Sequence, residues 1–151
     1  MFDTVVIATD GSESVERSVV VALDLAAKFD AEVHALYVID GSDVEGSPEQ
    51  VRAELRGALE DAGEAALETV VNHAQREVNT AVREGKPVSE ICQYADDFDA
   101  DVIAMGTRGR HGEHSLLLGS VAEGVVRRCS APVLTVRQLD ADEERAVETP
   151  A

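Results

Sequence analysis

A set of glycines followed by a serine is the part of this sequence best suited to binding chemistry. Gly106 and Gly109 are followed, after nine further residues, by Gly119 and Ser120. Glycines have no Cβ, so the backbone can turn and bring amide N–H groups close to anionic oxygens. Gly119 and Ser120 also open a helical pattern, and the N-terminal amides and dipole of a helix favour negative charge. We therefore predict a phosphate site from Gly106 to Ser120.

The residues of this segment also have purely structural explanations. Each glycine could simply supply a turn with positive φ. Ser120 and Glu123 match a capping box, which would start the helix without any ligand. The two interpretations are compatible, because a capping hydroxyl keeps a proton for a phosphate oxygen. Arg108 or Arg110 could add a charged donor to the same anion.

Other chemistries have less support. The turn Asp10-Gly11-Ser12-Glu13 contains no GxGxxG, and no GxxxxGK[ST] occurs in the chain. His111, Glu113 and His114 lie in a loop without a third ligand at helical spacing, which is weak support for a metal. Asp10 could hold Mg²⁺ on a triphosphate, but a single carboxylate does not indicate efficient phosphoryl transfer. We assign no catalytic residue and no metal ligand; His34 and His73 are interpreted as structural.

The elements that must position the glycine segment alternate between two types. Apolar, β-branched runs predict strands at 4–8, 33–39, 78–82, 101–105 and 132–137. Helical spacing of apolar residues predicts helices near 15–30, 51–74, 88–98 and 120–128, with a polar loop at 40–47. Such alternation predicts one open parallel sheet with helices on both faces. Ligands of these sheets bind beyond the carboxyl ends of the strands, where the strand order reverses.

Composition limits the class of protein. The 151 residues suit one domain, with an acidic tail at 138–151. A net charge of −17 argues against nucleic acid and anionic membranes as partners. No apolar run is long enough to span a bilayer, and we expect a cytoplasmic protein. Only two lysines accompany 30 acidic residues, which suggests a halophilic source, with an ordinary acidic protein as the alternative. Cys92 and Cys129 are too few for a disulfide scaffold and are expected to be buried thiols.

The spacing G-x2-G-x9-G-[S/T] resembles the ATP-binding motif of the universal stress protein family. Three other segments also resemble the sequences of this family: Ala8-Thr9-Asp10-Gly11-Ser12, Leu36-Tyr37-Val38-Ile39-Asp40 and Ala131-Pro132-Val133-Leu134. The resemblance covers residues 1–137. It implies a Rossmann-like, five-stranded parallel sheet of order 3-2-1-4-5 and a homodimer joined through the fifth strand.

The resemblance also implies ATP as the ligand. Thr9, Asp10 and Val38 would line the adenine pocket. The phosphates would be held by Gly109, Gly119, Ser120 and Val121, with Met105 and Gly106 close by. Arg108 is added to this site as the charged donor proposed above. Asp10 could equally start the first helix, and Val38 could simply pack in its strand.

The function that follows is an ATP-binding regulatory or sensor domain of a stress response. Two alternatives remain open at this point. One is a slow ATPase or nucleotidyl transferase on the same fold, and the other is an interaction module without nucleotide.

Overall fold

The computed structural model describes residues 2–12, 16–107 and 118–137. The expected tail at 138–151 lies outside these residues. The strands are β1 (Thr4–Thr9), β2 (Glu32–Asp40), β3 (Val78–Gly85), β4 (Val102–Gly106) and β5 (Val133–Val136). The helices are α1 (Glu16–Phe29), α2 (Gly41–Glu45), α3 (Arg52–His73), α4 (Pro87–Asp97) and α5 (Ser120–Arg128), with a short 3-10 turn, η2 (Glu49–Val51), before α3.

The five strands form one parallel sheet in the order β3-β2-β1-β4-β5, as predicted. β1 lies at the centre, and its residues are buried from Val5 to Thr9. A strand covered on both faces needs a continuous apolar run, and that run is what the sequence offers at this position. From β1 the chain adds β2 and β3 on one side of the sheet, and it then crosses back to add β4 and β5 on the other side. β1 and β4 therefore border the switch point of the sheet.

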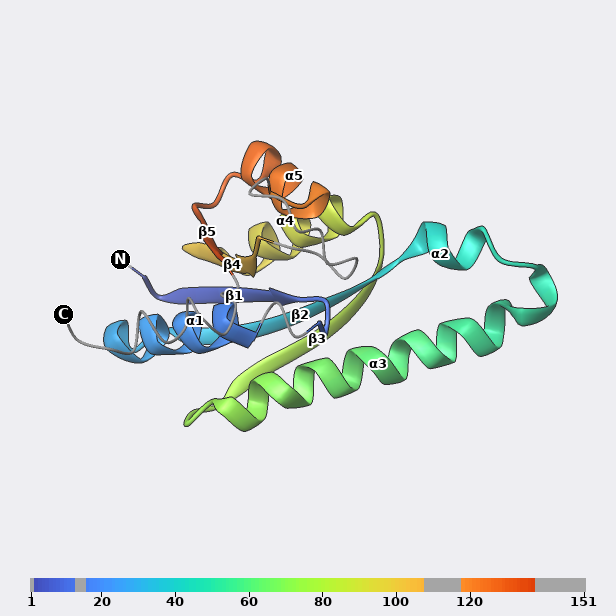
Figure 1. Cartoon of the computed structure of the whole chain (residues 1–151). Coiled ribbons are helices and arrows are strands. Elements are labelled where there is room, and N and C mark those ends of the chain that lie inside the picture. Colours follow the sequence, from blue (N-terminus) through green and yellow to red (C-terminus); the bar gives the residue numbers. More distant parts are fainter. Residues whose placement is uncertain (1, 13–15, 108–117, 138–151) are drawn as a thin grey trace, which may run out of the picture.

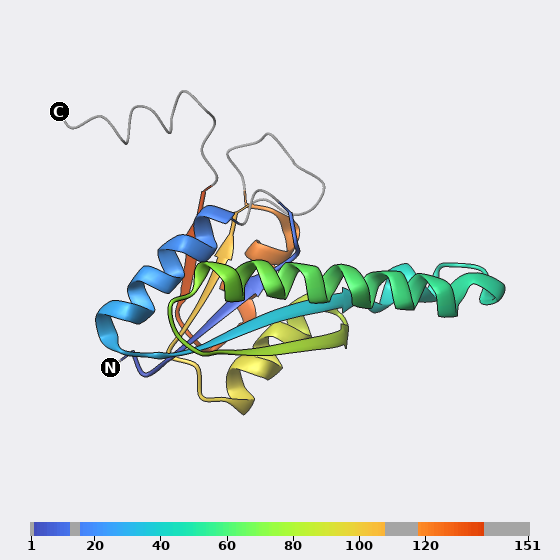
Figure 2. The same cartoon turned by 90° about the horizontal axis from the view of Figure 1, so that it is seen from below.

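Two helical layers cover the sheet (Figures 1 and 2). α1 and α3 lie on one face, where Val19, Ala22 and Val70 pack against side chains such as Ile7. α4 and α5 lie on the other face, where Ile91, Tyr94 and Val125 pack against side chains such as Ile103. Helices on both faces were predicted, and this arrangement is confirmed.

One predicted loop is partly helical. Residues 41–45 form α2, and Asp40 caps it by accepting a 3.0 Å hydrogen bond from the amide of Ser42. The segment 40–47 contains Asp, Gly and Ser, which indicate turns and helix caps alike. α2 and the first turns of α3 project beyond the sheet (Figure 1), and the side chains of residues 52–54 are exposed.

The expectation for the cysteines was wrong. Cys92 of α4 and Cys129, the C-cap of α5, form a disulfide with their Cα atoms 4.9 Å apart. Both residues are only partly buried. Cysteine number and spacing did not signal the bond, because it depends on how α4 and α5 pack together and joins residues 37 positions apart.

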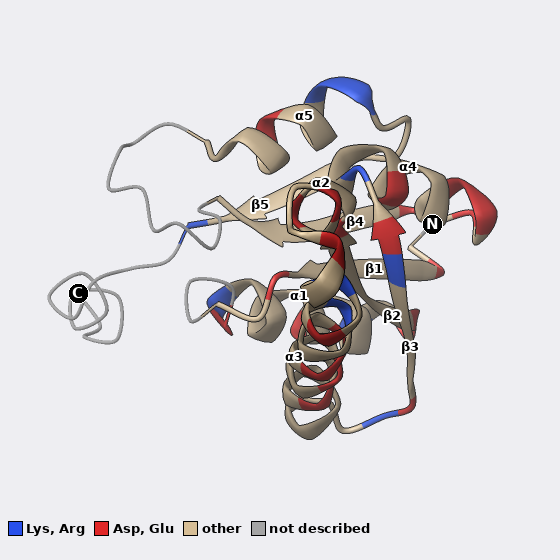
Figure 3. Cartoon of the chain, turned by 90° about the vertical axis from the view of Figure 1, so that its right-hand side faces the viewer, with Lys and Arg blue, Asp and Glu red and all other residues tan. Residues whose placement is uncertain are grey.

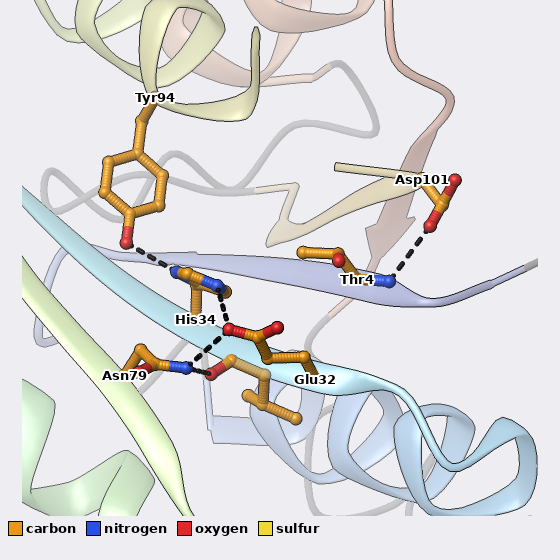
Figure 4. Close-up of polar contacts among 7 residues, drawn as sticks. Thr4, Glu32, His34, Asn79, Tyr94 and Asp101 are labelled. Carbon is orange, nitrogen blue, oxygen red and sulfur yellow. Dashed lines mark hydrogen bonds and ion pairs between the residues drawn. The ribbon is translucent and has the colours of Figure 1, made fainter. Parts of the chain in front are cut away.

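Polar side chains also connect elements inside the fold (Figure 4). His34 of β2 is 3% exposed and contacts the Tyr94 hydroxyl through Nδ1 at 2.7 Å and the Glu32 carboxylate through Nε2 at 3.0 Å. Asn79 of β3 donates to the same carboxylate. His73 contacts the carbonyl oxygen of Thr69 within α3. Both histidines thus make the intramolecular contacts of structural residues.

Candidate functional site

Those predicted site residues that the structure describes gather at the carboxyl edge of the sheet, where β1 and β4 end side by side. Ile7 pairs with Ala104, so continuing the register by two residues brings Thr9 level with Gly106. On its other side, Thr9 pairs with Tyr37, the residue before Val38. The residues expected around one ligand therefore come from three adjacent strands. They lie at the switch point, where open α/β sheets bind ligands.

The two ends of the glycine segment are joined directly. The amide of Gly119 donates a 2.7 Å hydrogen bond to the carbonyl oxygen of Thr107. The amide of Thr107 in turn donates to the carbonyl oxygen of Val136 at 3.2 Å. These two bonds hold the start of α5 beside the ends of β4 and β5. Thr107 was not among the predicted site residues, because its role is made by backbone atoms and leaves no mark in residue type.

The start of α5 differs from the predicted capping box. Gly119 is the N-cap and no side-chain capping bond occurs, so Ser120 is the first helical residue and its side chain is exposed. The first amide bonded within the helix is that of Glu123, which donates to Gly119. The amides of residues 120–122 therefore have no partner within the helix, as at any helix start. They and the helix dipole provide a place for an anion.

The turn after β1 forms a second part of the site. Asp10 Oδ1 accepts hydrogen bonds from the Ser12 amide at 2.9 Å and from the Ser12 hydroxyl at 2.6 Å. Gly11, with φ of +78°, donates its amide to Thr9 Oγ1 at 3.2 Å. Asp10 thus stabilises the turn and is partly exposed at the sheet edge. Residues 13–15, between this turn and the described part of α1, lie outside the described residues, so the interpretation of Asp10 as a helix start stays a prediction.

Three of the predicted residues share one apolar cluster. Val38, Met105 and Val121 belong to the core between the sheet and α4/α5, together with Ala8 and Leu118. Met105 is 6% exposed, whereas Val38 and Val121 are partly exposed. An apolar wall from β2, β4 and α5 thus lies beside the polar ends of the strands. A flat ring with a polar substituent matches that combination of surfaces.

Arg108 and Gly109 lie outside the described residues, as do Arg110, His111, Glu113 and His114. Within the described part of the chain, no three His, Cys, Asp or Glu side chains gather as metal ligands would. None of the helices described there is long and apolar enough to cross a membrane.

Charge is unevenly distributed around the site (Figure 3). Acidic residues recur along α3 on one side of the sheet. α5 carries Arg127 and Arg128 in its last turn, where they complement the negative end of the helix dipole. Its first turn carries one acidic residue, Glu123, which pairs with Arg127 at 2.8 Å. The N-terminal end of α5 therefore opposes anions less than the overall charge suggests.

Comparison with known proteins decides the family. The model of the universal stress protein family matches residues 1–137. The chain belongs to this family. Universal stress protein MJ0531 of Methanocaldococcus jannaschii is 39% identical over 142 residues, which are 91% of this chain and 84% of that protein. A universal stress protein of Thermus aquaticus is 32% identical and covered completely by 91% of this chain.

Solved structures of similar shape agree with the fold of this universal stress protein. Hypothetical protein MJ0577 has a TM-score of 0.78 and 28% identity, with 93% of this chain and 99% of that chain covered. A universal stress protein in complex with cAMP has a TM-score of 0.67 and 25% identity, with 91% and 98% covered. The fold and the family expected from the glycine spacing are both confirmed.

Proposed function

We propose that this universal stress protein is a regulatory or sensor domain that binds ATP at the carboxyl edge of its sheet. The Gly119–Thr107 hydrogen bond carries the proposal, because it fixes the first turn of α5 next to the end of β4. A helix start held at the switch point of a parallel sheet is a recurrent phosphate site. Binding of cAMP by a protein of the same family and fold supports an adenine nucleotide as ligand.

In this proposal, each part of the nucleotide has candidate contacts among the residues of the site. The amides of residues 120–122 and the Ser120 hydroxyl would meet the phosphates, with Gly109 and Arg108 as further candidates. Gly119 contributes differently from the expectation, since its amide already bonds Thr107. Val38 and Met105 would lie against the adenine, while Thr9 and Asp10 border the adenosine. Asp10 is the candidate to hold Mg²⁺ on the triphosphate.

A charge placed at position 120 separates binding from folding. Ser120 is exposed at the first position of α5, so its replacement disturbs no packing. Ser120→Asp adds a carboxylate that favours the helix dipole but repels phosphate. We expect ATP affinity to fall at least tenfold in Ser120→Asp, with thermal stability kept or raised. Ser120→Asn, the neutral variant of the same size, should lose much less affinity.

The measurement is calorimetric titration of ATP and of adenosine into the three proteins. If wild type shows no saturable binding of ATP, the proposed function is wrong. If Ser120→Asp binds ATP as tightly as wild type, the phosphates do not lie at the start of α5. Chromatography of the titrated nucleotide tests the enzyme alternative, because release of ADP or AMP faster than in Ser120→Asp would assign turnover to this site.

We also propose that the protein is a homodimer through β5. β5 is an edge strand with β4 on one side, and its residues from Val133 to Thr135 stay partly exposed. Pro132 and Val136 direct their carbonyl oxygens toward β4. Backbone groups alternate in direction along a strand, so those of Val133 and Thr135 point to the open edge. Pairing with a second copy would satisfy them and cover an edge that invites aggregation.

Proline at the open edge tests the dimer. Thr135→Pro removes an outward amide donor and leaves the pairing of β5 with β4 in place. We expect Thr135→Pro to sediment as a monomer, and Thr135→Val, which keeps the amide, to remain dimeric. A monomeric wild type at micromolar concentration would contradict the proposal. Equal dimerisation of both variants would move the interface away from β5.

The charge supports a further proposal about the source of the protein. At a net charge of −17, the surface carboxylates repel one another strongly in dilute buffer, and concentrated counterions screen that repulsion. We propose a cytoplasmic protein of a halophile, whose midpoint of thermal unfolding rises steeply with potassium chloride. A midpoint independent of salt between about 0.1 and 2 M would contradict it.

A further inference from the structure

The disulfide belongs to a set of contacts that joins α4 to α5. At the start of α4, a Cβ on Gly124 would lie only 2.6 Å from a methyl group of Val88, so the helices touch closely there. One turn later on α4, Cys92 is bonded to Cys129. A further turn along, Asp96 accepts a 3.0 Å hydrogen bond from the Ser130 hydroxyl. The disulfide is the only covalent one of these three links, and it lies at the C-terminal end of α5.

α5 is otherwise attached to the sheet by few side chains. The helix has nine residues, of which Ala122 and Val125 are buried and Val121 packs, partly exposed, against the same apolar cluster. Val126 is 47% exposed. A short helix with two buried small side chains gains little from packing, so the covalent link contributes a large share of its attachment. The same helix presents the amides of residues 120–122 at its other end.

We propose that Cys92 and Cys129 form a reversible thiol–disulfide modification site that sets the affinity of the nucleotide site. This inference rests on the proposed function, since the affected group is the start of α5. In the disulfide form, α5 is held on α4, and its first-turn amides are positioned before the ligand arrives. In the dithiol form, part of the binding energy goes into ordering α5, which lowers the affinity.

The modifying partner is a dithiol reductant, and the reverse partner is a disulfide oxidant. A thiolate of the reductant attacks one sulfur of the pair and forms a mixed disulfide, and the other protein sulfur leaves as a thiolate. The second thiol of the reductant then displaces the remaining protein sulfur. The protein gains two electrons and two protons, and the reductant becomes a disulfide. Both cysteines are partly exposed, which gives a reductant access to the bond.

The expected compartment favours a regulatory over a purely structural role. In reducing cytoplasm, disulfides are mostly transient, catalytic or redox-sensing. This bond closes a loop from α4 through β4 and the glycine segment to the end of α5. A single two-electron step therefore acts on the segment that carries the predicted phosphate site.

The test compares ATP affinity in two redox states of the full chain. Wild type is titrated by calorimetry after oxidation with oxidised glutathione and after reduction with a dithiol, with the state checked by alkylation and mass spectrometry. We expect the dissociation constant to rise about fivefold or more on reduction, within the usual range of coupling between two sites. Hydrogen exchange of the α5 amides should also become faster in the reduced protein.

A matched variant separates the redox effect from side effects of the reagents. The Cys92→Ser/Cys129→Ser protein should bind ATP as reduced wild type does and should not respond to either reagent. Equal affinity of oxidised and reduced wild type, with ATP bound in both, would overturn the inference and leave the proposed function intact. Absence of ATP binding in the oxidised state would overturn the proposed function itself. Failure of oxidised wild type to show the disulfide mass would also overturn the inference.

Discussion

The hydroxyl group of Tyr94 on α4 lies 2.7 Å from Nδ1 of His34 on β2, so a helix and a central strand are joined by one buried polar contact. Nε2 of the same ring contacts Glu32, and the guanidinium of Arg83 lies 4.7 Å above the Tyr94 ring. Removal of one partner leaves the other buried and unpaired, which costs more than the bond itself contributes.

Tyr94→Phe is therefore expected to lower the free energy of unfolding by about 1–3 kcal/mol. His34→Leu combined with Tyr94→Phe should cost less than the sum of the two single changes, because no polar atom is then left unpaired. Chemical denaturation of the four proteins measures this cycle. Strict additivity would show that the contact between the two side chains is not energetically coupled.

The phenol group of Tyr94 is expected to make the free energy of unfolding fall at alkaline pH. Burial raises the pKa of Tyr94, and the nearby Arg83 partly opposes that rise. Because the folded pKa lies above the unfolded value of about 10, the stabilisation is fully present below that pH and is lost as pH rises further. Denaturation at several pH values from 8 to 11 should show a steeper alkaline decline in wild type than in Tyr94→Phe. Parallel curves would contradict this.

The strand pattern made most of the fold predictable. Val5, Ile7 and Ala8 lie in a continuous apolar run that only a strand covered on both faces needs, and the alternation with helices implied a parallel sheet. β3 extends to Gly85, beyond the predicted end at Val82. Its last residues are polar because β3 is an edge strand, so apolar patterning does not mark its end.

The position of the candidate residues in the fold was predictable from the sequence, but their hydrogen bonds were not. The glycine spacing placed the candidate site at the carboxyl edge of the sheet, since Gly106 directly follows an apolar strand. The hydrogen bond from the Gly119 amide to the Thr107 carbonyl oxygen could not be predicted, because backbone atoms of any residue can make it. Gly119 rather than Ser120 is the N-cap, since both residue types are suited to that position and local sequence cannot choose between them.

A proline at position 119 tests the closure of the glycine segment. Gly119 has φ of −61°, which proline adopts, but proline lacks the amide that donates to Thr107. We expect Gly119→Pro to lower the free energy of unfolding by about 1 kcal/mol and to weaken ATP binding at least tenfold. Gly119→Ser keeps the amide and suits the N-cap, so it should keep the stability. If both variants lose affinity equally, the loss comes from an added side chain near the phosphates and not from the hydrogen bond.

Asp101 is expected to stabilise the opposite end of the sheet (Figure 4). Its Oδ2 accepts hydrogen bonds from the amides of Asp3 at 2.8 Å and of Thr4 at 2.9 Å, which joins the starts of β4 and β1. Asp101→Ala should lower the free energy of unfolding by about 1–3 kcal/mol, and Asp101→Asn by less, because an amide oxygen still accepts. Asp61→Ala removes an exposed carboxylate from α3 and should change stability by less than about 0.5 kcal/mol. Equal effects at both positions would assign the loss to net charge alone.

The disulfide has an effect on stability that can be measured without any nucleotide. It joins residues separated by 37 positions, and the chain-entropy estimate for such a loop is about 3–4 kcal/mol. Urea denaturation of wild type should therefore show a loss of that size when a dithiol reductant is added. The Cys92→Ser/Cys129→Ser protein should unfold at the same urea concentration with and without reductant. If reduction leaves the wild-type midpoint unchanged, the chain-entropy estimate does not describe this disulfide.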